Sequence, residues 1–564
     1  MRLSPIVTTL AGIYCLSLTT TALAEDVKSN GPEKAAATQR SIAAPKKPKL
    51  IVAISVDQLS ADLFAEYRPY YRGGLKRLSQ GAVFPSGYQS HSATETCPGH
   101  STILTGVHPA RAGIVGNQWF DLSVKRDDKR IYCAEDPTVE GSNSRSYQAS
   151  AKHLLVPTLG ERLKAAHPAS KNIAIAGKDR SALMMGGQDI DQVYWWKSDK
   201  FVSLKGRSNH DAVTKANARI AKQIASGARA IETPDHCQSR IAGMQLSKDY
   251  RVGDYAFARP PQKARFMAAS PYVDEEVLRT ALKLIEKEKL GQDDVTDVVS
   301  IGLSGTDYVG HAFGTEGLEM CIQMAKLDEY LARFFMILDK QGVDYAVMLT
   351  ADHGGHDLPE RLRQQGWPAA ARVDMALHPT SLDKMIKAKI KIERKEPVIY
   401  GTGAFGDFYV SKTLTEDQRT AVYDSAMSFF QNHDQVAAAF SAKDIAKMDM
   451  PSGPVQKWSL AERARASFHS ARSGDIIMML KEAITPIPGI RPGIVATHGS
   501  PWDYDRRVPI LFWQKNMRGF EQVMPIKTVD IAPTLASLVG LKVETSEFDG
   551  RCVDLDAGPE SSCK

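Results

Sequence analysis

Three aspartates and three histidines stand in short motifs spread over most of the 564-residue sequence. They are Asp57 in SVDQ, Asp307 and His311 in DYVGH, Asp352 and His353 in TADHGG, and His498 in ATHGSP. Each alone is more simply a turn former or a hydrogen-bonded structural residue. Together they favour metal binding, because Zn²⁺ takes both carboxylate oxygen and imidazole nitrogen. Six ligands exceed the needs of one four-coordinate ion, so the sequence predicts two Zn²⁺. Ca²⁺ at one position or elsewhere stays open, since carboxylates bind several hard cations.

A nucleophile for such a site is offered by the stretch ATETCPGHSTILTG at 93–106. Two metal ions about 4 Å apart promote phosphoryl transfer by stabilising the attacking and the leaving oxygen. Pro98 is expected at the first helical position, which places Thr96 at or just before the helix N-cap. There the helix dipole and a bound metal would both lower the pKa of the Thr96 hydroxyl. The alternative is that Thr96 only caps the helix, and without the six ligands this alternative would be preferred.

The elements that must position these residues follow an alternating pattern of strands and helices. Buried strands are predicted at 49–57, 172–177, 295–304, 344–352 and 507–513, and an amphipathic helix at 320–342. This alternation predicts an α/β sandwich with a mostly parallel central sheet flanked by helices. Asp57, Lys178, Asp307 and Asp352 all come at or just after strand ends, where α/β sheets bind ligands. They are therefore expected to converge on one site.

The rest of the chain divides into a leader and a catalytic domain. Residues 1–24 have the basic start, apolar run and small-residue cleavage site of a signal peptide, and 25–48 predict a flexible segment. A membrane anchor is disfavoured, because the apolar run is short and rich in Thr, so no stable membrane insertion is expected. A periplasmic or secreted protein is expected, with its catalytic domain at 49–564. Segments near 118–290 and 360–490 suit the sheet poorly and are interpreted as insertions that form a cap.

Cysteine content and charge add two expectations. The chain has seven cysteines, and loss of Cys15 with the leader leaves six, an even number that suits disulfides in an oxidising compartment. Cys552 and Cys563 could close a short loop, and Cys97 is expected to form a disulfide rather than react; the sequence predicts no other pairing. The net charge of +6 is weak evidence for a polyanion, so no nucleic-acid partner is required.

The order and spacing of these motifs resemble the alkaline phosphatase superfamily from about residue 49 to 545. The resemblance rests on the six metal-competent residues, Thr96 in TETCPGHSTILTG, Asn117 in GIVGNQWFD, and TVDIAPTLASLVG at 528–540. A Thr nucleophile before a Pro, with an Asn 21 residues later, is shared by nucleotide pyrophosphatase/phosphodiesterases and phosphate-irrepressible alkaline phosphatases. Lys178 and Arg180 in AGKDRSA resemble the Lys and Arg of the second group. The sulfatase signature C-x-P-x-R is absent from the sequence.

The resemblance implies a role for each of these residues. Asp307, His311 and His498 resemble the ligands of a zinc that faces the leaving group. Asp57, Asp352, His353 and the Thr96 hydroxyl resemble those of a zinc that activates the nucleophile. Asn117, Lys178 and Arg180 would contact the phosphoryl oxygens. The third, Mg²⁺ site of the Ser-type alkaline phosphatases has no recognisable counterpart here.

The predicted function is hydrolysis of a broad range of small-molecule phosphate monoesters to inorganic phosphate through a phosphothreonine intermediate, with room for weaker phosphodiesterase activity. The alternative is a phosphodiesterase or nucleotide pyrophosphatase that uses the same metals. A non-catalytic exported binder is disfavoured, because every ligand and the hydroxyl are present. The physiological ester and the oligomeric state stay open.

Overall fold

The computed structural model describes residues 47–558 and 560–563. The predicted signal peptide at 1–24 and nearly all of the segment at 25–48 lie outside the described residues. Within the described part, no helix combines the length and the apolar character that a membrane span requires. Alternating strands and helices confirm the predicted α/β class.

One large sheet runs through the main body in the order β19-β2-β18-β11-β1-β10-β5-β6-β7, with β20 beside β2. Its strands are β1 (Leu50–Val56), β2 (Ala82–Tyr88), β5 (Asn172–Ala176), β6 (Gln192–Lys197), β7 (Lys200–Val202), β10 (Asp297–Leu303), β11 (Tyr345–Thr350), β18 (Arg507–Gln514), β19 (Phe520–Glu521) and β20 (Ile526–Lys527). The neighbours from β11 to β6 pair in parallel. The predicted strand at 507–513 is present as β18, but it runs antiparallel to β11.

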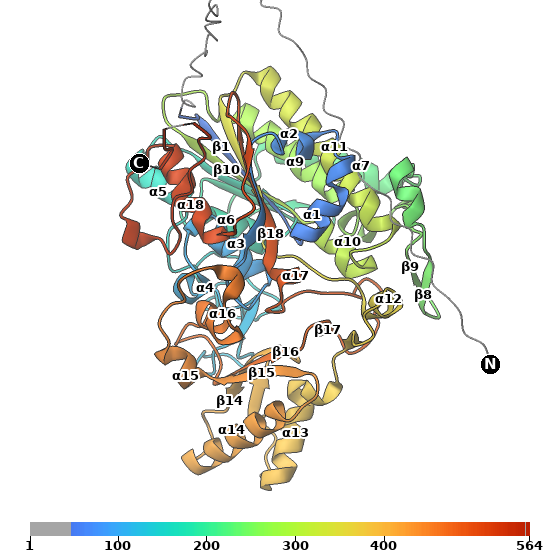
Figure 1. The fold of residues 1–564 in the computed structure, drawn as a ribbon, viewed down its shortest axis with the longest axis vertical. Coiled ribbons are helices and arrows are strands. Elements are labelled where there is room, and N and C mark those ends of the chain that lie inside the picture. The colour runs from blue at the N-terminus through green and yellow to red at the C-terminus, as the bar shows by residue number, and fades with distance from the viewer. Residues whose placement is uncertain (1–46, 559, 564) are drawn as a thin grey trace, which may run out of the picture. The chain divides into compact units, whose positions relative to one another are not determined.

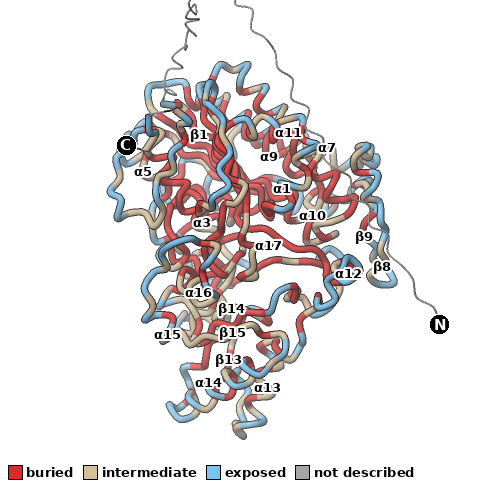
Figure 2. Tube along the Cα trace, viewed as in Figure 1, coloured by how far each residue is buried: buried red, intermediate tan, exposed pale blue. Residues whose placement is uncertain are grey.

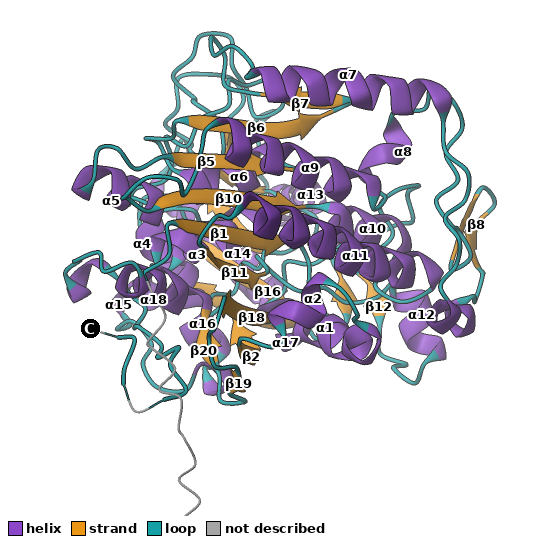
Figure 3. Cartoon of the chain, turned by 90° about the horizontal axis from the view of Figure 1, so that it is seen from above, coloured by secondary structure: helices purple, strands orange, loops and turns teal. Residues whose placement is uncertain are grey.

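Helices cover both faces of this sheet (Figures 1 and 3). Leu50, Val52, Ile54 and Val56 belong to one core, whereas Ile51 and Ala53 belong to the other. The first core also includes residues of α1 (Ala61–Tyr67), α2 (Gly74–Leu78), α7 (Asp211–Ser226), α9 (Tyr272–Lys287), α10 (Gly305–Phe313) and α11 (Leu318–Gln341). The second includes residues of α3 (Thr96–Thr105), α5 (Leu159–Ala166), α6 (Asp179–Gly186) and α18 (Ile531–Leu538). Because both faces are covered, β1 is buried along its whole length, which explains its continuous apolar sequence (Figure 2).

The segment 360–490 builds a second, smaller sheet in the lower part of Figure 1. Its order is β13-β14-β16-β15, from β13 (Ile399–Gly401), β14 (Gly406–Val410), β15 (Val436–Ser441) and β16 (Ile476–Leu480). Helices α13 (Pro379–Ile390) and α14 (Glu416–Gln431) contribute to the same core, in which Phe408 and Phe430 are fully buried. The segment therefore has a hydrophobic core of its own.

The segment 118–290 contributes strands to the main sheet, so the interpretation of all of it as a cap insertion needs correction. Strands β5, β6 and β7 lie in the main sheet, whereas β3 (Gln118–Phe120), β4 (Arg130–Tyr132), β8 (Met244–Ser247) and β9 (Tyr250–Val252) form separate hairpins. β6 ends in the exposed Lys197, and the short edge strand β7 begins with the exposed Lys200, so their apolar runs are short.

The described cysteines form three disulfides. Cys552 pairs with Cys563, as predicted, and Cys97 pairs with Cys133, which confirms that Cys97 is held in a disulfide. The third joins Cys237 to Cys321 of α11. The bond at Cys97 is the one that matters for the site, because it fixes the residue after Thr96.

Candidate active site

The predicted site residues gather at the carboxyl-terminal edge of the parallel strands. Asp57 follows β1 directly, Lys178 follows β5, Asp307 lies in the first turn of α10 after β10, and Asp352 follows β11. After Asp57 the chain turns sharply, with Gln58 in the left-handed region at φ 67°. Parallel pairing brings the four strand ends together although they are separated by up to 295 residues in the sequence, from 57 to 352.

Helix α3 starts earlier than the sequence suggested. Glu95 is the N-cap and Thr96 the first helical residue, so the prediction of Pro98 at the first helical position is wrong. Proline fits at the third position because the first turn of a helix needs no intrahelical N–H bonds. Thr96 Oγ1 is buried and has no hydrogen-bond partner among the described residues. Gly99 allows α3 to approach the end of β11, since a Cβ there would lie 2.0 Å from the Asp352 carbonyl oxygen.

One cluster consists of Asp307, His311 and His498. Asp307 Oδ1 lies 3.3 Å from His311 Nε2 and 3.4 Å from His498 Nε2. The Nδ1 atoms of the two histidines donate to backbone carbonyls, His311 to Ala496 at 2.9 Å and His498 to Thr94 at 2.8 Å. These bonds place the proton on Nδ1 and leave both Nε2 lone pairs directed at the cluster, which is the orientation that a metal ligand needs.

A second cluster adjoins the first and contains Asp57, Asp352 and His353. His353 Nε2 lies 3.3 Å from Asp352 Oδ2 and 3.5 Å from Asp57 Oδ1, while its Nδ1 donates to the Gly354 carbonyl. The His353 ring stacks on that of His498 with 3.5 Å between centroids. The stacked rings of His353 and His498 therefore form a contact between the two clusters.

Lys178 lies between the clusters. Its Nζ is 2.7 Å from Asp57 Oδ2 and 2.5 Å from Asp307 Oδ2, and the side chain is almost fully buried. Burial alone would lower the pKa of Lys178, but Asp307 and Asp57 outweigh it and the pKa is raised. Burial, together with the charges of Asp307 and Asp352, raises the pKa of Asp57. Three buried carboxylates, those of Asp57, Asp307 and Asp352, thus surround a single buried lysine.

This donor set fits divalent cations. Thr96 Oγ1, Asp57 Oδ1, Asp307 Oδ1 and His353 Nε2 are buried and make no hydrogen bond within the described chain. Ligand atoms of Asp307, His311 and His498 lie within 4.8 Å of one another, as do those of Asp57, Asp307 and His353. Buried polar atoms without partners are costly, and a cation would satisfy them while neutralising the excess charge.

Asn117 and Arg180 lie at the edge of this centre. Asn117 Oδ1 accepts a 2.8 Å hydrogen bond from the Cys97 N–H, so the amide NH₂ of Asn117 is the part that can donate to a ligand. Arg180 and Lys178 line a cavity of about 500 Å³, and Arg180 donates to the Tyr132 hydroxyl at 3.4 Å. All ten residues predicted from sequence therefore lie in or beside one region.

Comparison with known proteins places the chain in a family. The model of the type I phosphodiesterase / nucleotide pyrophosphatase family matches residues 51–501. The chain belongs to this family. It is 53% identical to alkaline phosphatase PhoK of Sphingomonas sp over 93% of this chain and 94% of that protein. It is 44% identical to alkaline phosphatase PhoD of Zymomonas mobilis subsp. mobilis, over 91% and 89% respectively.

A solved structure supports the same placement for this phosphodiesterase-family chain. Wild-type alkaline phosphatase PafA aligns with a TM-score of 0.78 and 25% identity, over 90% of this chain and 99% of that one. The resemblance to the alkaline phosphatase superfamily is thereby confirmed.

Two residues of this family member were missed in the sequence. His100 Nδ1 lies 2.9 Å from the Thr96 carbonyl oxygen and 3.0 Å from Asp352 Oδ2. Glu95 accepts a hydrogen bond from the Asn117 backbone N–H. Residues four apart lie on the same face of a helix. The spacing of Thr96 and His100 therefore brings the two residues together only if the helix already includes Thr96.

Proposed function

We propose that the chain is an alkaline phosphatase that hydrolyses phosphate monoesters, with Thr96 as nucleophile at a two-zinc site. One observation carries the proposal. The buried, unpartnered Thr96 hydroxyl lies at the start of α3 in a centre that also contains two imidazole–carboxylate clusters and the buried cation Lys178. The relatives named alkaline phosphatases PhoK and PhoD support the same reaction.

Each cluster would hold one ion. Asp307, His311 and His498 would hold the zinc on the leaving-group side, and Asp57, Asp352, His353 and Thr96 the other. Three imidazoles among the ligands favour Zn²⁺ over Ca²⁺, which takes oxygen ligands almost exclusively. When bound, the two ions supply Lewis-acid stabilisation to the attacking and the leaving oxygen.

The residues of the chain then act in two displacements. Thr96 Oγ1, after losing its proton to solvent, attacks phosphorus. The P–O bond to the alcohol oxygen breaks, the leaving alkoxide takes a proton from solvent, and a phosphothreonine forms. Water then attacks the phosphothreonine, which releases inorganic phosphate and returns the hydroxyl. The first-turn N–H groups of α3 and its dipole stabilise negative charge at Thr96. Asn117, Lys178 and Arg180 donate to the non-bridging phosphoryl oxygens.

Lys178 and Arg180 favour monoesters over diesters. A monoester dianion offers its extra charge to two cations, whereas a diester presents a second organic group at one of those positions. The phosphodiesterase alternative uses the same ligands and differs in this preference alone. Rates for a monoester and a diester with the same leaving group test the choice. We expect kcat/KM to favour the monoester at least tenfold, and a preference for the diester would reverse the proposal.

We also propose that the protein is exported, on grounds that do not depend on its activity. The pattern at 1–24 is that of a signal peptide, and three disulfides between described cysteines suit an oxidising compartment. N-terminal sequencing of protein from the periplasm or the medium tests it, with cleavage expected near Ala24. An intact N-terminus on cytoplasmic protein would contradict it.

A further inference from the structure

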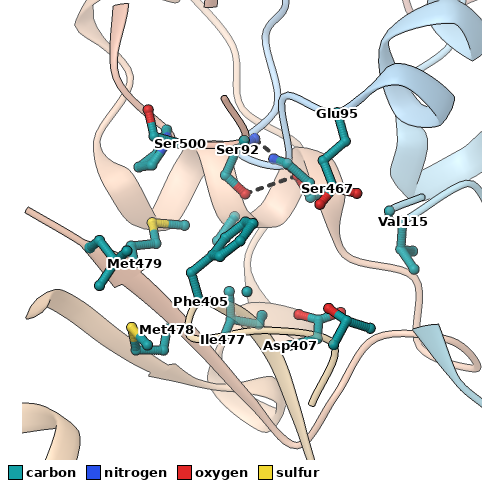
Figure 4. A pocket seen from close by; sticks show the side chains of 18 of the residues that line it. Ser92, Glu95, Val115, Phe405, Asp407, Ser467, Ile477, Met478, Met479 and Ser500 are labelled. Carbon is teal, nitrogen blue, oxygen red and sulfur yellow. Dashed lines mark hydrogen bonds between the residues drawn. The ribbon is translucent and has the colours of Figure 1, made fainter. Parts of the chain in front are cut away.

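A cavity of about 70 Å³ lies between the start of α3 and the inserted sheet (Figure 4). The main body contributes Glu95, Val115 and Gly499, and the inserted segment contributes Phe405 and the β16 residues. Figure 4 shows the Phe405 ring between Ser467 and Ile477, inside the cavity wall. The inserted segment thus builds one side of a cavity whose other side belongs to the active-site body.

Two residues that line this cavity are sequence neighbours of candidate site residues. Glu95 is the N-cap that precedes Thr96, and Gly499 follows His498. A Cβ on Gly499 would lie 3.1 Å from Phe405 Cε2 and 3.7 Å from Glu95 Cγ. Gly499 has a φ of 112°, which other residues rarely adopt, so the close approach of Phe405 depends on this glycine. Phe405 therefore packs directly on the segment that carries His498.

The lining has a definite chemical character. Phe405, Ile477, Met478 and Met479 form an apolar wall, and methionine side chains adapt readily to the shape of a guest. Among the described lining residues there are two acids, Glu95 and Asp407, and no Lys, Arg or His. An apolar group would gain free energy by leaving water here, whereas an anionic group would lose its hydration and meet no cation in the lining.

We infer that this cavity binds the alcohol part of the substrate and selects a small, uncharged, apolar group. The inference rests on the proposed function, because it uses the direction of the in-line displacement. The leaving oxygen departs on the side of Asp307, His311 and His498. The carbon chain attached to it can then extend past Gly499 to Phe405. Phe405 is thereby assigned as a specificity-determining residue supplied by the inserted segment.

Ethyl phosphate and isobutyl phosphate test this assignment, because their alcohols are similar leaving groups and differ by two carbons. Each buried methylene is worth roughly fourfold, so the two extra carbons should make kcat/KM for the isobutyl ester about 15-fold higher in the wild-type enzyme. Phe405→Ala should reduce that ratio to about threefold or less, because the alanine side chain leaves the larger alcohol with less apolar surface to contact. Phe405→Leu keeps an apolar side chain and should retain most of the ratio. This variant tests whether a lower ratio in Phe405→Ala results from loss of the apolar contact or from loss of folding.

Binding provides a second readout that needs no turnover. Isobutylphosphonate should bind more tightly than ethylphosphonate by the same ratio in calorimetry of the holoenzyme, and Phe405→Ala should abolish the difference. Phe429→Ala is the matched control, because Phe429 is a partly buried aromatic residue of α14 in the inserted segment that does not line the cavity.

The outcomes separate the two proposals. If both esters are hydrolysed at equal kcat/KM, or if Phe405→Ala and Phe429→Ala change the ratio equally, the cavity is not the alcohol site and the inference is overturned. If neither ester is hydrolysed by zinc-loaded enzyme, the proposed function itself is wrong. A carboxylate-bearing ester, 3-phosphoglycerate, should react more slowly than ethyl phosphate, and a faster reaction would also overturn the inference.

Discussion

Lys178 Nζ lies 2.5 Å from Asp307 Oδ2, while Asp307 Oδ1 faces His311 and His498. The buried Asp307 carboxylate therefore contacts a candidate phosphoryl-binding cation through one oxygen and faces the two histidines of its metal cluster through the other. This contact fixes the ammonium group before any substrate arrives, and a group held in place loses little entropy when it binds.

Substitution of Arg180 should lower the hydrolysis of monoesters more than that of diesters. Arg180→Ala is expected to lower kcat/KM for a monoester about 10- to 100-fold, the worth of a hydrogen bond to a charged group, and for a matched diester less than about fivefold. Steady-state hydrolysis of the two esters measures both values. Lys197→Ala, an exposed lysine that lines the same cavity, should leave both rates unchanged. Equal losses for the two esters after Arg180→Ala would favour the phosphodiesterase alternative.

Thr96→Ala should abolish the covalent intermediate. Without Oγ1 no P–O bond to the enzyme can form, so kcat is expected to fall at least about 1,000-fold, as for loss of other catalytic nucleophiles. Acid quenching with radiolabelled substrate should detect phosphothreonine in the wild type and none in the variant. Thr96→Ser keeps a hydroxyl and should retain measurable labelling. Thr105→Val, at the other end of α3, is the control, and full turnover by Thr96→Ala would refute the assignment.

The sequence predicted the convergence of the strand-end aspartates for a physical reason. Asp57, Asp307 and Asp352 each follow a strand that is buried on both faces, and such strands have continuous apolar sequences that are easy to recognise. Parallel strands place their carboxyl ends at one edge, so the convergence of these aspartates follows from local patterns alone.

What the sequence did not predict depends on long-range packing. The position of Phe405 beside Gly499 results from antiparallel pairing within the inserted sheet and its placement against the main body, and no local pattern encodes either. The start of α3 was misplaced because Pro98 is acceptable anywhere in a first turn. The contact between His100 and Asp352 joins distant parts of the chain, so no local pattern indicated it.

Asp274 should make stability depend on pH. It is fully buried, and its carboxylate accepts from the Gly305 N–H and from Gln323 Nε2, so it supports the start of α10, which carries Asp307. Burial raises the pKa of Asp274 to about 7, above the value of about 3.9 in an unfolded chain. The folded protein therefore holds this proton more tightly. The resulting stabilisation is complete below pH ~4 and disappears as pH rises through ~7.

Asp274→Asn should remove that dependence. The difference in free energy of unfolding between wild type and variant should shift in favour of the variant between pH 5 and pH 8.5, by at most about 2.7 kcal/mol. Urea denaturation of both proteins at each pH measures this difference, and titration of the metal ligands cancels because both proteins share them. A difference that stays constant with pH would mean that the pKa of Asp274 is not raised.

The Cys97–Cys133 disulfide should support catalysis. Cys97 follows Thr96, its N–H donates to Asn117 Oδ1, and the Cys133 N–H donates to the Asn117 carbonyl. The bond therefore holds nucleophile and phosphoryl donor in one unit. The double variant Cys97→Ala/Cys133→Ala is expected to lower kcat about 10- to 100-fold, since displacements near 1 Å cost about that much.

The control for this disulfide is the C-terminal one. Removing Cys552–Cys563, which closes a loop with a sequence separation of only 11 residues, should leave kcat within about twofold of the wild type. Both double variants lose one cross-link, so a general loss of stability would lower the melting temperature in each. Only the first should also lower kcat at temperatures well below melting. Unchanged kcat in the Cys97→Ala/Cys133→Ala variant would show that packing alone positions Thr96 and Asn117.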